Sequence, residues 1–189
     1  MGEAVHPFPL TISQPSDYLY NARHTTSPKA SSDGGINEMS SQYKNAHESP
    51  GHLLWQVTTM WQKEVRRVLD PLGLTPPQFV LLHGCLWLNE RDTEGKGVTQ
   101  VQLAHFANVD VNVTSQVLRA LEKRGLILRS RHQTDTRANI IATTPEGTEL
   151  ANRGIQLVEE ADRQFFDLVS DHKEEYMDIM RELIKNKSE

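Results

Sequence analysis

The chain of 189 residues has room for one ordinary domain with an appendage, and its 37% hydrophobic and 24% charged residues are typical of a globular protein. A single cysteine excludes an internal disulfide, and no stretch reaches the ~20 consecutive apolar residues that a membrane span needs. The N-terminus lacks the apolar run of a signal peptide and the motif for myristoylation, so the sequence predicts a cytoplasmic protein without a membrane anchor.

Charge is distributed unevenly along the chain. The net charge of −5 argues against nucleic acid as a partner at first sight, because phosphate contacts come from Lys and Arg. Between residues 99 and 145, however, six Lys or Arg stand against three Asp or Glu, whereas residues 146–189 hold six against twelve. Charges farther away than a Debye length of ~8 Å do not cancel a local field. The distribution therefore indicates a basic reading surface on an acidic body.

Residues 1–50 differ in composition from the rest of the chain. They contain eight Ser and five of the nine Pro, and no sustained helical or strand period runs through them. We expect a flexible N-terminal extension. The alternative, an arm that wraps a partner subunit or reaches DNA, stays open.

The first helix is predicted between His52 and Leu72, where apolar residues recur every three or four positions. A break follows at residues 70–73. Thr75 is then expected to cap a second helix, from about residue 76 to 89, whose first turn holds two prolines. This second helix is apolar nearly all round, so we expect it to be buried.

Two helices with a short turn between them come next. Thr99 is expected to cap a short helix that ends near Phe106, and after a turn at residues 108–110 a longer helix covers about residues 111–124. Gly125 ends this helix as a C-cap. The lengths and the turn are those of a helix-turn-helix.

A β-hairpin and two further helices complete the chain. The β-prone runs 127–132 and 139–143 flank a polar turn and form a hairpin wing, and helices are expected over 145–170 and 171–185. The predicted fold class is mainly α (α+β), a winged helix-turn-helix. We expect residues 75–144 to form the DNA-binding domain, and residues 51–74 with 145–189 a helical dimerisation region.

The helix at 111–124 is predicted to read DNA. At ~100° per residue, its apolar half consists of Val113, Thr114, Val117, Leu118 and Leu121, and its polar half of Asn112, Ser115, Gln116, Arg119 and Lys123. Asn and Gln can pair bidentately with adenine, and Arg pairs with guanine or phosphate. Taken alone, the polar half could be an ordinary solvated face. Its position as the second helix of a helix-turn-helix, before a basic wing, favours a role in DNA binding.

The hairpin carries the second group of predicted DNA contacts, namely Arg129, Arg131, His132 and Arg137. A minor groove or a phosphate backbone attracts such cations. Asp135 can orient the guanidinium of Arg137 through a charge-assisted pair, or it can act as a purely structural lock of the turn.

These residues resemble the multiple-antibiotic-resistance regulator (MarR) family over about residues 52–170. The resemblance is carried, in order, by Leu74-Thr75, Gln78-Phe79, Leu103-Ala104, the run Leu121–Ile127, Asp135–Ala138 and Thr143–Gly147. It implies a homodimer with intertwined terminal helices and two winged heads on a pseudo-palindrome of double-stranded DNA, often with repression relieved by a small ligand or an oxidant. The extension before residue 51 departs from the family pattern.

The resemblance also implies a pocket for a small aromatic or phenolic effector between the first, second and fifth helices. The candidate lining residues are Trp55, Trp61, His83 and Trp87. Each of them can instead belong to the core or the dimer interface.

Cys85 raises the question of redox sensing, because some members of the family sense hydroperoxides through a cysteine in the first helix. This chain has no cysteine there, and Cys85 lies among leucines with no cation nearby to lower its pKa. We expect a buried core thiol.

No motif in the sequence points to an enzyme. Metal-ligand spacings, a nucleophile elbow, a phosphate-binding loop and a dinucleotide fingerprint are all missing, so neither a metal nor a cofactor is expected. The stronger rival is a winged helix used as a protein-interaction module without DNA binding. Such a surface would show exposed Leu, Phe or Trp in place of Asn112 and Gln116.

Overall fold

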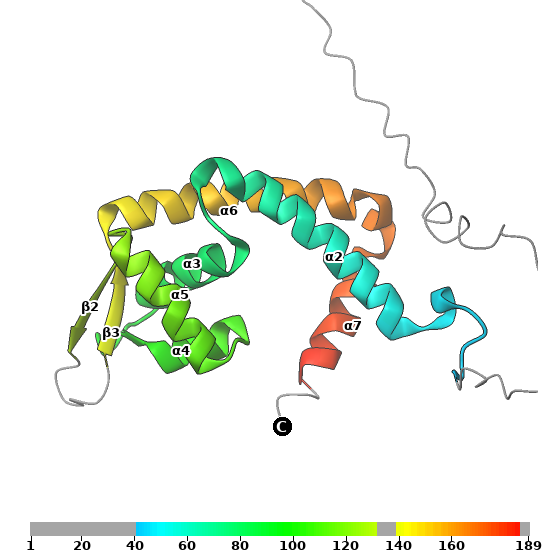
Figure 1. Cartoon of the computed structure of the whole chain (residues 1–189), viewed down its shortest axis with the longest axis horizontal. Helices are drawn as coiled ribbons and strands as arrows, with labels where there is room; N and C mark the ends of the chain where they lie inside the picture. The colour runs from blue at the N-terminus through cyan, green and yellow to red at the C-terminus, as the bar shows by residue number, and fades with distance from the viewer. Residues whose placement is uncertain (1–40, 132–138, 186–189) are drawn as a thin grey trace, which may run out of the picture. The chain divides into compact units, whose positions relative to one another are not determined.

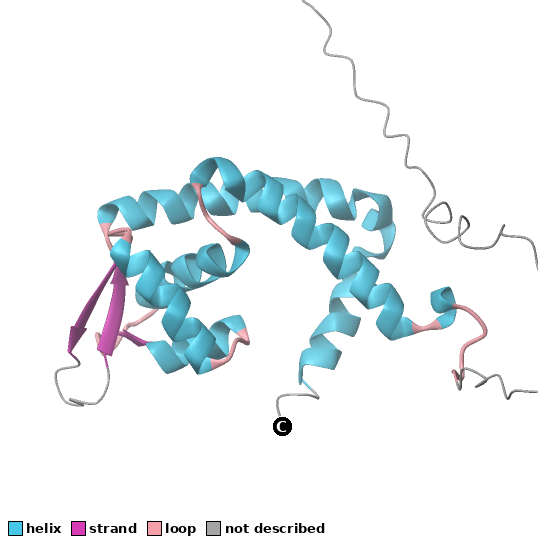
Figure 2. Ribbon diagram, viewed as in Figure 1, coloured by secondary structure: helices cyan, strands magenta, loops and turns pink. Residues whose placement is uncertain are grey.

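The computed structural model describes residues 41–131 and 139–185, so residues 1–40 of the N-terminal extension, the tip of the wing and the last four residues lie outside the described residues. The described chain is mainly helical, with one small sheet (Figures 1 and 2), as expected. Its elements are η1 (Ala46–Glu48), α2 (Pro50–Leu69), η2 (Asp70–Leu72), α3 (Pro76–Glu90), β1 (Val98–Thr99), α4 (Gln100–Ala107), α5 (Val111–Lys123), β2 (Ile127–Arg131), β3 (Asn139–Thr143), α6 (Pro145–Phe166), η3 (Asp167–His172) and α7 (Lys173–Lys185), where η marks 3₁₀ helices.

Local sequence signals set most of the helix ends. Thr75, Thr99 and Thr144 each accept a hydrogen bond from a backbone N–H in the first turn of α3, α4 and α6, which confirms these predicted caps. Gly125 follows α5 with a φ of 72°, as a left-handed C-cap requires. Asp110, expected only as part of a turn, caps α5 by accepting from the N–H of Asn112 at 2.7 Å.

The sheet has three antiparallel strands in the order β1-β3-β2. β2 and β3 form the predicted wing, in a register that pairs Ile127 with Thr143 and Arg131 with Asn139. β1 was not foreseen, because two residues carry no period. Val98 pairs with Ile141 of β3 and is buried, so pairing with β3 and burial stabilise this short strand.

Helix α3 lies at the centre of the core and contacts α2, α4, α5, α6 and β3. Its Leu81, Leu82 and Cys85 are fully buried, as predicted. The expectation that α3 is buried all round is wrong at its last turn, where Trp87 is 41% exposed. The guanidinium of Arg91 covers one face of this ring, 3.1 Å from the ring centroid, in a cation–π contact.

Helices α2 and α6 pack along each other and extend away from the winged part (Figure 1). The Trp61 indole N–H donates to Asp162 Oδ1 at 2.7 Å across this contact. The predicted helix over 145–170 ends earlier, at Phe166, where the chain passes into the 3₁₀ helix η3. Within η3, Val169 leaves the helical region with a φ of −121°. After this kink α7 leaves α6 at an angle.

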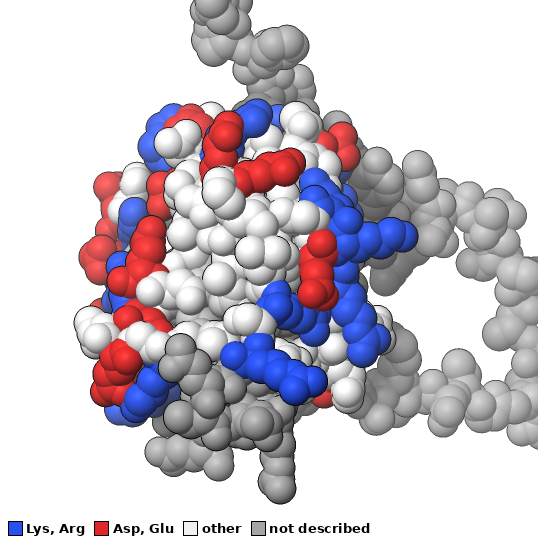
Figure 3. Space-filling model, turned by 90° about the vertical axis from the view of Figure 1, so that its left-hand side faces the viewer, with Lys and Arg blue, Asp and Glu red and all other residues white. Residues whose placement is uncertain are grey.

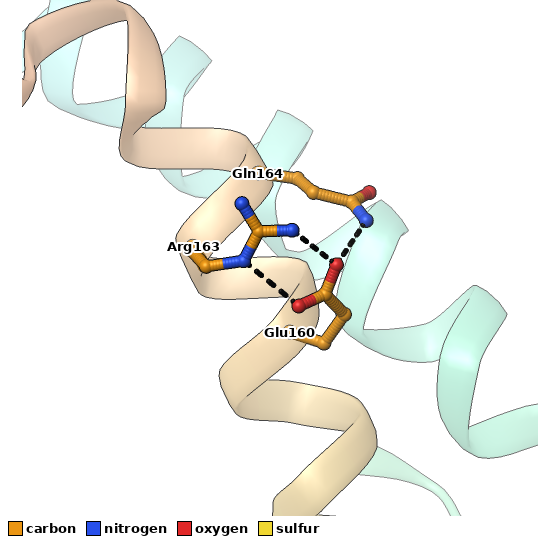
Figure 4. Close-up of polar contacts among 3 residues, drawn as sticks. All are labelled: Glu160, Arg163 and Gln164. Atoms are coloured by element: carbon orange, nitrogen blue, oxygen red, sulfur yellow. Dashed lines mark hydrogen bonds and ion pairs between the residues drawn. The ribbon is translucent and has the colours of Figure 1, made fainter. Parts of the chain in front are cut away.

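Helix α6 carries a small, exposed polar cluster (Figure 4). Glu160 accepts hydrogen bonds from Arg163 at 2.6 and 2.9 Å and from Gln164 at 2.6 Å. These donors lower the pKa of Glu160 to about 2. The group is fully exposed, so solvent screens the pair and we assign it no role in the function.

Candidate nucleic-acid interface

The start of α5 is held firmly against the helix before it. α4 ends at Asn108, which adopts a left-handed φ of 49°, and Asp110 then caps α5. Gln100, in the first turn of α4, donates its side-chain amide to the carbonyl of Val111 at 3.2 Å. The first turn of α5 is therefore placed by a cap and by a tie to α4.

The two halves predicted for α5 agree with its burial except at one residue. Thr114, Leu118 and Leu121 are fully buried, while Asn112, Gln116, Arg119 and Lys123 are exposed and Ser115 is half-buried. Val113, expected on the apolar buried half, is 47% exposed. It lies at the edge between the two halves, so the helix period alone did not decide its burial.

The wing arginines differ in their surroundings. Arg131 is exposed at the end of β2. The Arg129 side chain is only 17% exposed, and its Nε lies 3.1 Å from Glu122 Oε2 on α5. This ion pair holds the wing against α5, so the geometry favours a positioning role for Arg129 over the DNA contact predicted from the sequence. His132, Asp135 and Arg137 lie outside the described residues.

Arg124 has a structural partner that sequence reasoning missed. Its guanidinium donates to the carbonyl of Gly73 at 2.7 Å and contacts that of Leu72 at 3.5 Å. These carbonyls belong to the break after α2, about fifty residues earlier in the chain. Arg124 thus connects the end of α5 with the end of α2.

Asn89 is a second positioning residue that the sequence reasoning missed. Its side-chain amide donates to the carbonyl of Cys85 at 2.7 Å and to that of Ile141 at 3.0 Å, which ties α3 to the central strand. The signal was present in the sequence, because an amide follows a run of apolar residues at the end of a helix expected to be buried.

The basic residues of this region gather on one side of the molecule. Figure 3 looks onto the end that carries the wing, where Lys and Arg lie along one side of the face and Asp and Glu predominate along the other. Between residues 99 and 131, the exposed cations are Arg119, Lys123, Arg124 and Arg131. This arrangement agrees with the charge asymmetry of the sequence.

The predicted effector residues come together only in part. His83 stacks on Phe79, with ring centroids 5.8 Å apart, and its ring centroid lies 6.5 Å from that of Trp87. Burial lowers the pKa of His83, and Glu159 and Glu90 partly oppose this shift. Trp55 and Trp61 lie on α2, where Trp55 is 70% exposed and Trp61 is bonded to Asp162.

A hollow of about 520 Å³ lies elsewhere, between α6, η3 and α7. Phe166, Tyr176 and Met180 are among its lining residues, and none of the four predicted effector residues is.

Cys85 is buried, and its Sγ lies 3.5 Å from the carbonyl oxygen of Ile141. Burial raises the pKa of the Cys85 thiol to about 12, against a smaller opposing effect of Asn89. The expectation of a core thiol is confirmed.

The described residues, 41–131 and 139–185, contain neither a candidate metal site nor a candidate membrane span. No group of three or more His, Cys, Asp or Glu in them could hold a metal ion. None of their helices has the length and apolar character to cross a membrane.

Two packed helices, of which the second has an exposed polar face, followed by a β-hairpin that is braced against that helix, define a winged helix-turn-helix protein. Residues 74–138 match the model of the MarR family. The chain is 36% identical over 149 residues to the uncharacterized HTH-type transcriptional regulator YdcH of Bacillus subtilis, covering 79% of this chain and 99% of that protein. The chain belongs to the MarR family of transcriptional regulators, and such relatives are regulators, not enzymes.

Solved structures of family members share the fold. CouR of Rhodococcus jostii RHA1 bound to p-coumaroyl-CoA is 25% identical, with a TM-score of 0.63 over 76% of this chain and 94% of CouR. CouR bound to a 23-mer DNA duplex is 25% identical, with a TM-score of 0.62 over 74% of this chain and 94% of CouR. The Mycobacterium tuberculosis protein Rv2887 in complex with salicylic acid is 29% identical, with a TM-score of 0.52 over 71% of this chain and 96% of Rv2887.

Proposed function

We propose that this regulator is a ligand-responsive repressor that binds a pseudo-palindromic operator as a homodimer. The observation that carries the proposal is the polar face of α5. Asn112, Gln116 and Arg119 are exposed on a helix whose opposite face is fully buried and whose two ends are tied to α4 and to the end of α2. Such a helix can enter a major groove without rearranging.

Each side chain of this face has a role suited to its chemistry. The amides of Asn112 and Gln116 pair with the N6 and N7 edge of adenine, and Ser115 adapts to either strand. Arg119 pairs with guanine or with phosphate, and Arg131 binds phosphate from the wing. For Arg137 and Asp135, which lie outside the described residues, the sequence-based expectation of a further contact from Arg137 stays a prediction.

A second copy of the chain is the partner that the described surface favours. Leu54 and Trp55 on α2, Leu168 on η3 and Leu183 on α7 are all more than half exposed within one subunit. Apolar side chains concentrated at the end away from the wing are typical of an interface between subunits. A dimer built there presents two α5 helices to successive major grooves, ~34 Å apart.

The proposed effector is a small aromatic or phenolic compound. The complexes of CouR with p-coumaroyl-CoA and of Rv2887 with salicylic acid support this class. In this chain His83 and Trp87 form a half-exposed aromatic face on α3, the helix that also packs against α5 and β3. A ligand on that face would act on the reading helix through α3, and it would relieve repression.

DNA binding is tested on the DNA upstream of the gene, by anisotropy at several salt concentrations. Gln116→Ala and Asn112→Ala are each expected to cost ~1–3 kcal/mol and to relax preference at one base per half-site, because each loses a bidentate base contact. Arg131→Ala should weaken binding to all sequences alike and reduce the slope of log affinity against log salt by ~0.9 per subunit, the effect of one phosphate contact.

Arg163→Ala is the matched control, since Arg163 is an exposed arginine on α6, outside the winged region, and is paired with Glu160. It should leave affinity and slope unchanged. If no DNA is bound at low salt, the winged helix is a protein-interaction module instead.

Sedimentation at micromolar concentration should find a dimer of the wild type. Leu54→Lys combined with Leu183→Lys should give a monomer, because two cations would be buried in an apolar interface. Leu128→Lys changes an equally exposed leucine on β2 of the wing and should stay dimeric. A monomeric wild type contradicts the proposed assembly.

A further inference from the structure

We propose that Val113 is a specificity residue, which contacts the C5 methyl group of a thymine beside the base that Asn112 or Gln116 reads. The inference rests on the proposed function, since it requires α5 to enter a major groove. It adds an apolar contact to a reading face that is otherwise polar. Thymine is the base that offers a methyl group in that groove.

The exposure and position of Val113 carry the inference. It is the third residue of α5, and recognition helices contact base edges mainly with their N-terminal residues. At ~100° per residue, it lies ~60° around the helix from Gln116 and ~180° from Glu122. Because Glu122 is paired with Arg129 of β2, Val113 lies on the edge that faces away from the wing and borders the reading face.

The backbone at Val113 is held in place before any ligand binds. Asp110 Oδ1 accepts from the N–H of Val113 at 3.3 Å, next to its shorter bond from Asn112. The following residue, Thr114, is fully buried. A β-branched side chain also has few χ1 rotamers to lose. Val113 can therefore present its two methyl groups with little loss of entropy.

Val111 is a weaker candidate for the same role. It is 41% exposed, but it lines a groove of about 400 Å³ together with Val101, His105 and other residues of the α4–α5 turn. Its side chain therefore borders α4 and the turn. Val113 does not line that groove.

The test uses the operator selected by the wild-type protein, with each thymine replaced in turn by deoxyuridine, which pairs identically but lacks the methyl group. At one thymine per half-site the wild type should lose about three- to fivefold in affinity, the effect of one buried methyl group. Val113→Ala changes both subunits, so on the thymine operator it should lose a similar factor per half-site. Replacing the thymine by deoxyuridine should then cost this variant nothing further. Its salt slope should match that of the wild type, since no phosphate contact changes.

Two further variants make the result specific. Val113→Thr keeps one methyl group and should retain part of the thymine preference. Val101→Ala removes a more exposed valine of α4 and should keep the full wild-type sensitivity to deoxyuridine. The inference is overturned if no thymine position is sensitive, or if Val113→Ala still loses affinity on deoxyuridine. In both cases the wild type binds DNA; if it does not, the proposed function itself fails.

Discussion

Replacing Gly147 by alanine should destabilise the fold by about 3 kcal/mol, at the upper end of what overpacking costs. A Cβ at this position would lie 1.9 Å from the carbonyl oxygen of Leu126 and 2.8 Å from its carbonyl carbon. Both atoms are backbone, so no side-chain rotation can relieve the clash. The first turn of α6 would have to move off the junction between α5 and β2.

Hydrogen bonds at the same junction make that movement costly. The N–H of Thr144 donates to Leu126 O at 3.1 Å, and the Thr144 hydroxyl donates to Gly125 O at 2.8 Å while it accepts from the N–H of Gly147. A shift of α6 breaks these bonds together. The Thr-Thr-Pro-Glu-Gly run at residues 143–147 is therefore the place where the start of α6 packs against the winged region.

Urea unfolding measures the effect, with Gly51→Ala as the control. Gly51 lies in the first turn of α2 with nothing within 4 Å of a Cβ, so alanine there should be neutral or stabilising by up to ~1 kcal/mol. Equal urea midpoints for Gly147→Ala and Gly51→Ala would contradict the prediction, because the junction between α6 and Leu126 would then accommodate a Cβ without loss of stability.

The wild type should lose stability above pH 9 relative to a Cys85→Ala variant. Burial raises the pKa of Cys85 to about 12 from an ordinary value of 9.0, so the folded state keeps the thiol while the unfolded state ionises. The contribution of this raised pKa is fully present below pH 9 and is lost as the pH rises toward 12. The difference in free energy of unfolding between the two proteins should shrink by ~1.4 kcal/mol per pH unit, roughly 2 kcal/mol by pH 10.5.

Urea titrations at several pH values measure this difference, and the ionisation of Tyr and Lys cancels because both proteins contain them. A thiol reagent at pH 8 should react with the protein only after unfolding. DNA binding by Cys85→Ser should respond to peroxide as the wild type does. Parallel stability curves, or rapid labelling of the folded protein, would contradict the buried thiol.

Much of the architecture could be predicted from local signals. Thr75, Thr99 and Thr144 cap their own first turns, so a few neighbouring residues suffice to locate those helix starts. The periodicity of α5 separated Asn112 and Gln116 from Leu118 and Leu121 correctly, because a helix fixes the direction of each side chain. The order and spacing of the motifs indicated the family.

Contacts between distant residues could not be predicted in this way. Arg124 looks like another basic residue of the reading region, yet its partners are the carbonyls of Leu72 and Gly73. Arg129 is predicted to contact DNA from the wing, and the sequence did not indicate its ion pair with Glu122. A guanidinium can reach many carbonyls and carboxylates, and only the packed elements decide which of them is near.

The sequence by itself determined the helices apart from the end of α6, the three threonine caps, the hairpin and the polar half of α5, since each depends on residues within a turn or two of one another. The tertiary structure decided the strand β1 and the hydrogen bonds that join α5 to α4 and to the end of α2. It also decided the close packing of Gly147 of α6 against Leu126, and the exposure of Val113. These depend on distances between segments separated by up to about fifty residues. A side chain at the edge of a helix is buried or exposed according to what packs beside it, and periodicity carries no information about that neighbour.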